Sequence, residues 1–374
     1  MINKFYDHYR YSYNKTVDLI NTKNEPIHDF SWISELGTIE TKSSVTNCYS
    51  KYELRNMVVP EKNHAFTPWL TESPFQVKAY GVFEAYNRYR TCIKNTQKGN
   101  INHFSLGFKK KRQPRWTMDV PKDNIYKEDS KAFFLYKQSG LLKTTEKMKD
   151  ITKDCKIHFD GISYYILVPY DKSIQESKPK NYWCSIDPGS RKFGTIYSPC
   201  EQDNFFIGEK ASKKLHGLLL NLDKVISLLS INPTKVLKNK KIYLTNKIKN
   251  LQQELHRKLS KFLCDNYNHI LIPKLTKDND IIKKTKRKIH SKTVRMMAVL
   301  GHCKFVEMLK TKANEYTDVH VEIVTEEFTS QTCLNCKTRT KTTSEYFECR
   351  NCDFKSDRDV LGSINIFLKH FNYL

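Results

Sequence analysis

Two pairs of cysteines near the C-terminus constrain the fold of this chain more than any other feature. Cys333 and Cys336 form the first CxxC pair, and Cys349 and Cys352 form the second. Each pair presents two thiolates on a tight turn, and four thiolates about 2.3 Å from one ion complete a tetrahedral zinc site. The spacing therefore predicts a zinc ribbon with one structural Zn²⁺, in which no coordination position stays open for catalysis.

The remaining cysteines support this interpretation. The chain has 11 cysteines in total, and all those outside the two pairs stand singly. An odd and mostly isolated set indicates a reducing compartment, in which disulfide bonds are rare. Zinc binding by the clustered cysteines is therefore favoured over disulfide formation.

The charge of the chain predicts a polyanionic partner. Lys and Arg number 64 against 40 for Asp and Glu, which gives a net charge of +24 over 374 residues. Nucleic acid is the first partner to expect, and an anionic membrane the second. No apolar run reaches the roughly 18 residues of a bilayer-spanning helix, so no membrane is expected. We predict a nucleic-acid-binding protein of two or three domains.

Two basic segments are candidates for contacts with phosphate groups, one at 109–115 and one at 283–295. The first also suits a nuclear-import signal or a solvated loop. The predicted nucleic-acid-binding residues are Lys109, Lys110, Lys111, Arg112, Arg115, Lys283, Lys284, Lys286, Arg287 and Lys288.

Hydrophobic spacing predicts the order of helices and strands. The N-terminal region is mainly helical, with helices at 9–21 and 74–94, and a β-hairpin at 155–169 turns at Asp160 and Gly161. The second half is expected to contain strands at 182–187 and 192–197, helices at 209–231 and 234–266, a strand at 269–275, a helix at 293–316, a strand at 319–325 and a closing helix from about 360. This order suits a mixed α/β sheet of ribonuclease H type.

Acidic side chains at two of these elements are candidates for metal chemistry. Asp187 ends a predicted buried strand, where a carboxylate is costly unless it binds a metal or is paired. An ordinary turn aspartate is the alternative, because Asp-Pro-Gly is turn composition. Asp357 and Asp359 open the closing helix, where one can cap the helix while the other does chemistry. A strand-end acid and a helix acid are two of the carboxylates that a two-metal phosphodiesterase needs.

Residues 181–374 resemble the RuvC nuclease half of TnpB and its eukaryotic and viral relatives, the Fanzors, which are kin of the type V CRISPR effectors. A nuclease acid, an inserted zinc ribbon and a second nuclease acid follow one another in the family's order. The matching segments are 185–189, 328–336 and 357–366, with fainter similarity at 10–14, 108–111 and 164–169.

The resemblance implies an α/β and α+β multidomain fold. A helical recognition lobe and a wedge-type β-barrel would be followed by a ribonuclease H-like (RuvC) domain with an inserted zinc ribbon. The implied boundaries are 1–105 for the recognition region, 106–180 for the wedge barrel, 181–328 for the first part of the RuvC domain, 329–356 for the zinc ribbon and 357–374 for the last RuvC helix.

The position at which the family usually carries its middle acid has no acid in this chain. Typical TnpB proteins carry it in a strand similar to Ile-Glu-Asp-Leu, whereas Pro273 occupies its place here. Fanzor-like proteins carry this glutamate just ahead of the zinc ribbon, which corresponds to Glu326, with Glu327 as the alternative. Asp278 and Asp280 are weaker candidates. Neighbouring strands lie about 4.8 Å apart, so a glutamate ending one strand can serve in place of one on the next.

Two further departures concern the family pattern. Leu361 stands where the family usually has asparagine, so we expect the start of the last helix to be repacked. By the same resemblance, the chain is expected to begin inside the first recognition helix, without the preceding barrel strand. Both departures bear on activity and leave the resemblance itself intact.

The resemblance implies an RNA-guided DNA endonuclease. Asp187, Glu326 and Asp359 would be catalytic and would hold two Mg²⁺ ions. The partners would be an omega-type guide RNA and a double-stranded DNA target, in a monomeric ribonucleoprotein. The alternatives are a catalytically impaired RNA-guided remnant, a zinc-ribbon DNA-binding protein without a guide, and a strand-transfer transposase. Nuclear localisation is expected in a eukaryotic or viral setting, and cytoplasmic localisation otherwise.

Overall fold

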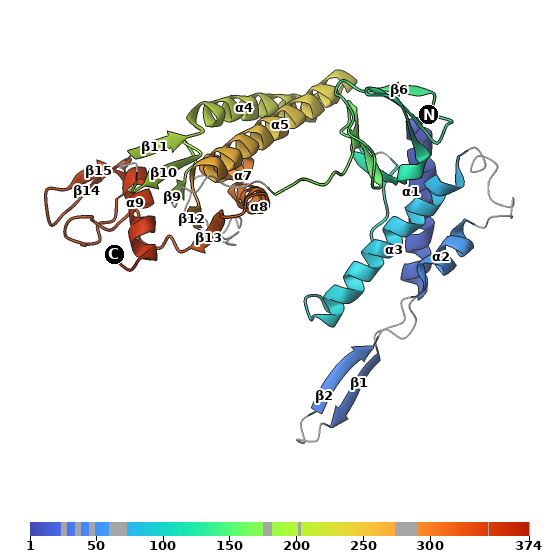
Figure 1. The fold of residues 1–374 in the computed structure, drawn as a ribbon, viewed down its shortest axis with the longest axis horizontal. Helices are drawn as coiled ribbons and strands as arrows, with labels where there is room; N and C mark the ends of the chain where they lie inside the picture. The colour runs from blue at the N-terminus through green and yellow to red at the C-terminus, as the bar shows by residue number, and fades with distance from the viewer. Residues whose placement is uncertain are drawn as a thin grey trace. The chain divides into compact units, whose positions relative to one another are not determined.

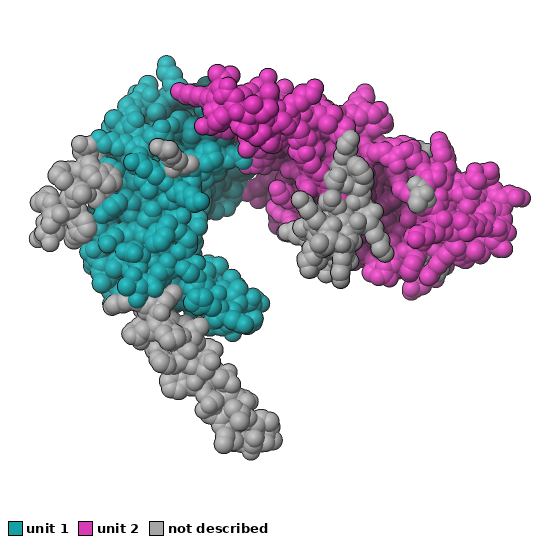
Figure 2. Space-filling view, turned by 180° about the vertical axis from the view of Figure 1, so that it is seen from behind, with its two compact units in different colours: residues 1–171 teal, residues 172–374 magenta. Residues whose placement is uncertain are grey.

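The computed structural model describes residues 1–374 except 24–27, 34–38, 45–48, 60–72, 112, 175–181, 201–202, 274–290, 343 and 374. The chain forms two compact units, residues 1–171 and 172–374, which Figure 2 shows in different colours. Within the described ranges, none of the helices combines the length and apolar character of a membrane span. The finer domain boundaries expected from the family stay a prediction.

Helices form one part of unit 1. They are α1 (Ile2–Lys23), α2 (Lys51–Val58) and α3 (Phe75–Gln97), and a hairpin of β1 (His28–Ile33) and β2 (Ile39–Ser44) lies between α1 and α2 in the chain (Figure 1). The predicted helices at 9–21 and 74–94 are confirmed as parts of α1 and α3. These two helices pack so closely that a Cβ atom on Gly81 would collide with the carbonyl oxygen of Tyr9.

Strands form the rest of unit 1. One antiparallel sheet has the order β3-β7-β8 (Trp116–Val120, Cys155–Phe159 and Tyr164–Leu167), and the other has the order β4-β5-β6 (Ile125–Asp129, Ala132–Leu135 and Leu141–Lys143). The 3₁₀ turn η2 (Lys122–Asn124) connects β3 to β4. Both sheets share an apolar core with α1, in which Phe5, Met118 and Leu135 are buried. The described strands form no closed barrel, so the predicted wedge-type β-barrel is not confirmed.

The predicted hairpin at 155–169 is confirmed as β7 and β8. Asp160 Oδ1 accepts hydrogen bonds from the backbone nitrogens of Ile162 (2.9 Å) and Ser163 (2.8 Å). Gly161 has a φ of 99°, which glycine adopts at little cost. The Asp-Gly turn was therefore correctly located by its composition.

A five-stranded mixed sheet forms the centre of unit 2. Its order is β11-β10-β9-β12-β13, with bounds Asp203–Ile207, Gly194–Ser198, Trp183–Pro188, His269–Pro273 and His320–Val324. β10 is antiparallel to both of its neighbours, whereas β9, β12 and β13 are parallel. The carboxyl ends of these three strands therefore meet at one edge of the sheet, and that edge is where parallel sheets usually place their ligand sites.

Helices cover the sheet of unit 2 (Figure 1). α4 (Glu209–Ile231) and α5 (Lys235–Asn266) form the predicted pair with its break at Asn232 and Pro233. The single helix predicted at 293–316 is wrong, because it is split into α7 (Ser291–Leu300) and α8 (His302–Ala313). Gly301 lies between them with a φ of 64°, a left-handed conformation that interrupts the helix.

Alternation along β9 separates the core from the site. Cys184 and Ile186 are buried in the main core with residues of α5 and α8. Ser185 and Asp187 point to the opposite face, since successive side chains of a strand alternate. There they meet α9 (Arg358–His370), the closing helix, which packs against β9 and β10.

Candidate metal centres

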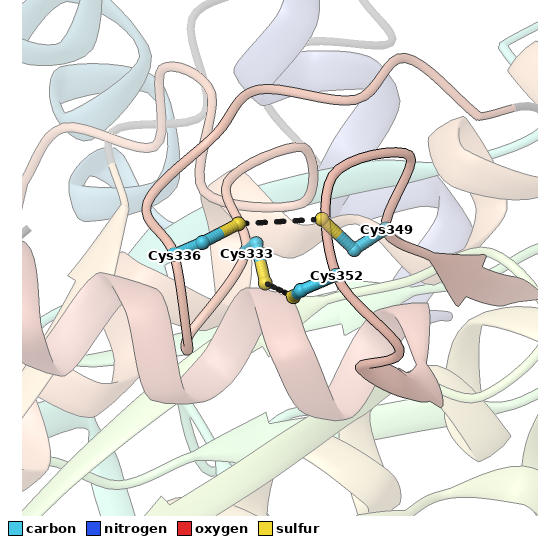
Figure 3. Close-up of side chains that lie close together, drawn as sticks. All are labelled: Cys333, Cys336, Cys349 and Cys352. Atoms are coloured by element: carbon cyan, nitrogen blue, oxygen red, sulfur yellow. Dashed lines mark hydrogen bonds between the residues drawn. The ribbon is translucent and has the colours of Figure 1, made fainter.

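The sulfur atoms of the four clustered cysteines lie close together (Figure 3). All four lie within 4.8 Å of one another. Cys333 Sγ is 3.6 Å from Cys352 Sγ, and Cys336 Sγ is 3.4 Å from Cys349 Sγ. Sulfurs at 2.3 Å from a tetrahedral ion are about 3.8 Å apart, so this cluster could hold a zinc ion.

The two CxxC turns have the same local geometry. The backbone nitrogen of Asn335 donates to Cys333 Sγ at 3.4 Å, and that of Asn351 donates to Cys349 Sγ at 3.4 Å. Hydrogen bonds from Thr338, first from its side chain and then from its backbone, lower the pKa of Cys336 to about 5. The lowered pKa favours the thiolate, which is the form of cysteine that binds zinc.

The ribbon connects directly to the closing helix. Its strands β14 (Tyr346–Glu348) and β15 (Lys355–Asp357) pair antiparallel, and α9 begins at the next residue. Leu361 is fully buried in a small core with Cys333 and Phe347. Leu361 thus packs the first turns of α9 against the ribbon, and the repacking relative to the family stays a prediction.

Asp187 is the strand-end acid of the candidate nuclease site. It lies on β9, in the last residues of the strand, and is half-buried. Burial, followed by the negative charges of Asp359 and Glu326, raises the pKa of Asp187 well above its usual value, while Arg358 lowers it. The charges of Asp359 and Glu326, two of the three acids predicted from the sequence, thus act on the third, Asp187.

The carboxylates form a looser group than the cysteines. Within the described ranges, only the four cysteines bring three or more ligand atoms of Cys, His, Asp or Glu within 4.8 Å of one another. The three acids interact electrostatically through a longer separation. Such spacing is compatible with ligands distributed over two ions, which lie about 3.5–4 Å apart in two-metal sites.

Asp357 and Asp359 divide the roles that were predicted for them. Asp357 Oδ1 caps α9, accepting from the backbone nitrogens of Asp359 (2.8 Å) and Val360 (3.3 Å). Lys192 Nζ lies 3.6 Å from the other carboxylate oxygen of Asp357. The cap is thus a separate residue, and the carboxylate of Asp359 is not used for it.

Two contacts that the sequence did not predict join α9 to β9. The hydroxyl of Ser185 donates to the carbonyl oxygen of Ser363 at 2.7 Å. A Cβ atom on Gly362 would collide with Asp187 Oδ2 and would lie 3.1 Å from its Cγ. A glycine inside a helix costs about 1 kcal/mol of stability relative to alanine. The presence of Gly362 within the predicted helix could therefore have indicated a close approach of another segment.

Glu326 follows β13 at the same edge of the sheet. Its carbonyl oxygen accepts from Thr329 Oγ1 (2.8 Å) and from the backbone nitrogen of Thr329 (3.3 Å), so a tight turn begins there. The charge of Glu326 acts on Asp187, and Glu327 is not among the charges that shift the pKa of Asp187. This difference favours Glu326. Asp278 and Asp280 lie outside the described residues.

The structure does not support Lys109 as a phosphate contact. Its side chain is buried, forms an ion pair with Glu84, and has its Nζ 5.0 Å from the ring centre of Tyr9 and 4.8 Å from that of Tyr13. Burial lowers the pKa of Lys109, and Glu84 opposes this effect. Lys109 is therefore a structural cation inside unit 1. The sequence did not reveal this role, because Lys109 stands in a run of three lysines.

The other predicted phosphate contacts fall into two groups. Lys110 and Lys111 are exposed, and the Nε of the half-buried Arg115 donates to the carbonyl oxygen of Asp160 at 3.3 Å. The remaining candidates lie outside the described residues: Arg112, Lys283, Lys284, Lys286, Arg287 and Lys288.

Known proteins resemble this chain along nearly all of its length. Residues 302–366 match the family model of the Cas12f1-like TNB domain. A TnpB-like protein of Acanthamoeba polyphaga mimivirus is 25% identical over 371 residues, which cover 96% of this chain and 68% of the relative. A protein of Paramecium bursaria Chlorella virus 1 with a provisional transposase name is 24% identical over 385 residues, covering 99% of this chain and 83% of the relative.

A solved structure also aligns with the chain. It is a cryo-EM structure of a Cas12f1–sgRNA–target DNA complex, with a TM-score of 0.34 and 12% identity over 98% of this chain and 93% of that one. The family-model match includes the ribbon and most of the closing helix. Together with the two viral relatives, it supports the resemblance of this chain to TnpB-like proteins.

Proposed function

We propose that this chain is an RNA-guided DNA endonuclease that hydrolyses phosphodiester bonds at Asp187, Glu326 and Asp359. One observation carries the proposal: these acids come from β9, from the turn after β13 and from α9, and the charges of the other two act on Asp187. The strand order of unit 2, with β10 antiparallel to its neighbours, suits a ribonuclease H-like sheet. Structural ion-pair networks can also shift pKa values, but this group contains three acids and one cation.

The donor atoms of this group suit magnesium. All three side chains offer carboxylate oxygens, which are the ligands that Mg²⁺ prefers. When bound, two Mg²⁺ ions would activate water and neutralise the charge that develops on the phosphodiester. Burial and the charges of Asp359 and Glu326 raise the pKa of Asp187, so a proton would compete with a cation at this carboxylate.

The proposed partners are an omega-type guide RNA and a double-stranded DNA target in a monomeric ribonucleoprotein. The net charge of +24 supports a polyanionic partner, and the family model that matches the ribbon belongs to Cas12f1-like proteins. Lys110 and Lys111 are exposed candidates for phosphate contacts. Since such contacts release counterions, binding should weaken steeply as salt is raised.

The test compares the wild-type chain with an Asp187→Ala variant, both purified with the RNA that accompanies them. We expect the wild type to cut DNA that pairs with this RNA when Mg²⁺ is present, and Asp187→Ala to bind the same DNA without cutting it. Asp353→Ala is the matched control, because Asp353 is an exposed aspartate of the ribbon. Guided cutting by Asp187→Ala would refute the assignment.

Two other outcomes would favour the alternative functions. A wild-type complex that binds its target and never nicks it would indicate a regulatory or catalytically impaired protein. A chain that purifies without a discrete RNA and still binds DNA would indicate a zinc-ribbon DNA-binding protein.

A further inference from the structure

We propose that Asn365 is a positioning residue of the nuclease site, which clamps the turn after Glu326 to the helix that carries Asp359. This inference rests on the proposed function, since it concerns the same three acids. It assigns to one buried amide the relative placement of two carboxylates that come from separate segments.

The contacts of Asn365 are unusual for a helix residue. Its side chain is fully buried on α9, and its Nδ2 donates to the carbonyl oxygens of Thr329 and Thr332, both at 2.7 Å. The two acceptors belong to the segment between β13 and the first cysteine pair. Asn365 thus uses both hydrogens of its amide to hold a segment more than thirty residues away in sequence.

The clamp reaches Glu326 through one residue. Thr329 is buried, and both its backbone nitrogen and its Oγ1 donate to the carbonyl oxygen of Glu326, at 3.3 and 2.8 Å. The chain of contacts therefore runs from Asn365 to the carbonyl of Thr329, and from the two donors of Thr329 to Glu326. These hydrogen bonds fix the backbone of Glu326, whose side chain is exposed. Supporting hydrogen bonds of this kind orient the ligands of a metal site.

The same helix also positions the other two acids. Asp359 lies six residues before Asn365, about 9 Å along the helix axis. Between them, Gly362 contacts the carboxylate of Asp187, and the carbonyl of Ser363 accepts from Ser185. α9 therefore carries Asp359 and contacts the two segments that supply the other acids. Asn365 holds the segment after Glu326 from a buried position, and Lys369 Nζ adds an exposed contact to the carbonyl oxygen of Glu327 at 3.0 Å.

A purely structural role makes a different prediction. If Asn365 only satisfied two buried carbonyl groups, its loss would cost stability, about 1–3 kcal/mol for unpaired buried groups, and would leave metal affinity unchanged. If it positions Glu326, its loss also weakens metal binding, by about 10–100-fold as found for outer-shell partners of metal sites.

The experiment compares Asn365→Ala with Ile366→Val. Ile366 is the next residue of α9 and is fully buried, and its shortening by one methyl group lowers stability by about 0.5–1.5 kcal/mol without touching the clamp. Two quantities are measured on the folded proteins: Mn²⁺ binding by calorimetry without DNA, and the Mg²⁺ concentration for half-maximal cleavage by the RNA complex.

We expect Asn365→Ala to weaken Mn²⁺ binding and to raise the half-maximal Mg²⁺ concentration, each by about 10-fold or more, with cleavage partly restored by excess Mg²⁺. Ile366→Val should lower the melting temperature and change neither metal quantity. If Asn365→Ala does not fold, Thr329→Val replaces it, because this near-isosteric change removes only the Oγ1 bond to Glu326. For Thr329→Val we expect weaker Mn²⁺ binding and a higher half-maximal Mg²⁺ concentration, each changed less than in Asn365→Ala.

The outcomes separate this inference from the proposed function. In one outcome, the wild type binds metal and cleaves DNA, and the Asn365→Ala or Thr329→Val protein has the same metal affinity as the wild type. This outcome would overturn the positioning role and leave the nuclease intact. Absence of both Mn²⁺ binding and cleavage in the wild type would overturn the nuclease and the positioning role together.

Discussion

The cysteine cluster and the carboxylate group are two candidate metal centres of different construction. The cysteines all lie between residues 333 and 352, on two turns with the same geometry, and their sulfurs already stand at nearly the spacing of a zinc tetrahedron. The acids lie at residues 187, 326 and 359, on three elements of unit 2, and form a wider group.

The pKa shifts of Cys336 and Asp187 have opposite directions. Hydrogen bonds from Thr338 lower the pKa of Cys336, whereas burial and neighbouring acids raise the pKa of Asp187. The shift at Cys336 favours the thiolate that binds zinc. The carboxylate group concentrates like charge, which the surrounding packing must hold together. A local motif can be complete in itself, but a dispersed one depends on its supporting contacts.

The largest expected effect concerns the ribbon. Cys349→Ala should remove bound zinc, and with it much of the roughly 10–16 kcal/mol that zinc contributes to small structural sites at pH 7. Because Leu361 packs against the ribbon, cleavage should also be lost. Metal analysis and a thermal melt would measure this. Cys200→Ala is the control, since Cys200 is exposed and lies outside the cluster; equal zinc content in both variants would contradict the four-cysteine site.

Next in size is the loss of an acid. Asp359→Ala should reduce cleavage by on the order of 10³-fold, equal to about 4 kcal/mol of barrier, and leave zinc content and melting nearly unchanged. The neighbouring Asp357→Ala removes the helix cap, which should cost about 1 kcal/mol of stability with a far smaller loss of cleavage. Single-turnover cleavage rates and melting temperatures of both variants measure these two effects. Equal kinetic losses in the two would mean that Asp359 has no special role.

An intermediate effect is expected where the two centres join. Leu361→Ala should destabilise unit 2 by about 2–5 kcal/mol, because it leaves a cavity between α9 and the ribbon. Denaturant unfolding measures this change. Leu220→Ala on α4, where the side chain is 46% exposed, should cost much less. Similar losses for both leucines would show that the small ribbon core is not a stabilising contact.

The smallest effect isolates the repulsion among the acids. With a chelator for Mg²⁺ present, Asp187→Asn should melt higher than the wild type at neutral pH, by about 2 °C or more for each kcal/mol relieved. The raised pKa of Asp187 means that its contribution to stability is present below the usual carboxyl pKa and is lost as pH rises through the folded value. The advantage of the variant should therefore grow with pH and vanish in acid, as melting at several pH values would show. A constant difference would argue against a raised pKa.

Several parts of this protein follow from local patterns. The spacing of the cysteines predicts the ribbon, helical periodicity predicts α4 and α5 with the break at Pro233, and Asp160 with Gly161 predicts the hairpin turn. Each of these signals is complete within a short segment, so no knowledge of distant contacts is needed. The single helix predicted across Gly301 shows the limit, because helical periodicity does not reveal the left-handed conformation that Gly301 adopts.

The carboxylate group shows what only tertiary structure decided. The sequence determined which acids were available, from a strand end, a helix start and a family resemblance. The fold decided that Asp357 caps α9, and that the charges of Asp359 and Glu326 act on Asp187. It also placed Lys109 inside a core, although its neighbours are exposed. The physical reason is that charge interactions and close packing depend on distances between segments, which no spacing along the chain contains.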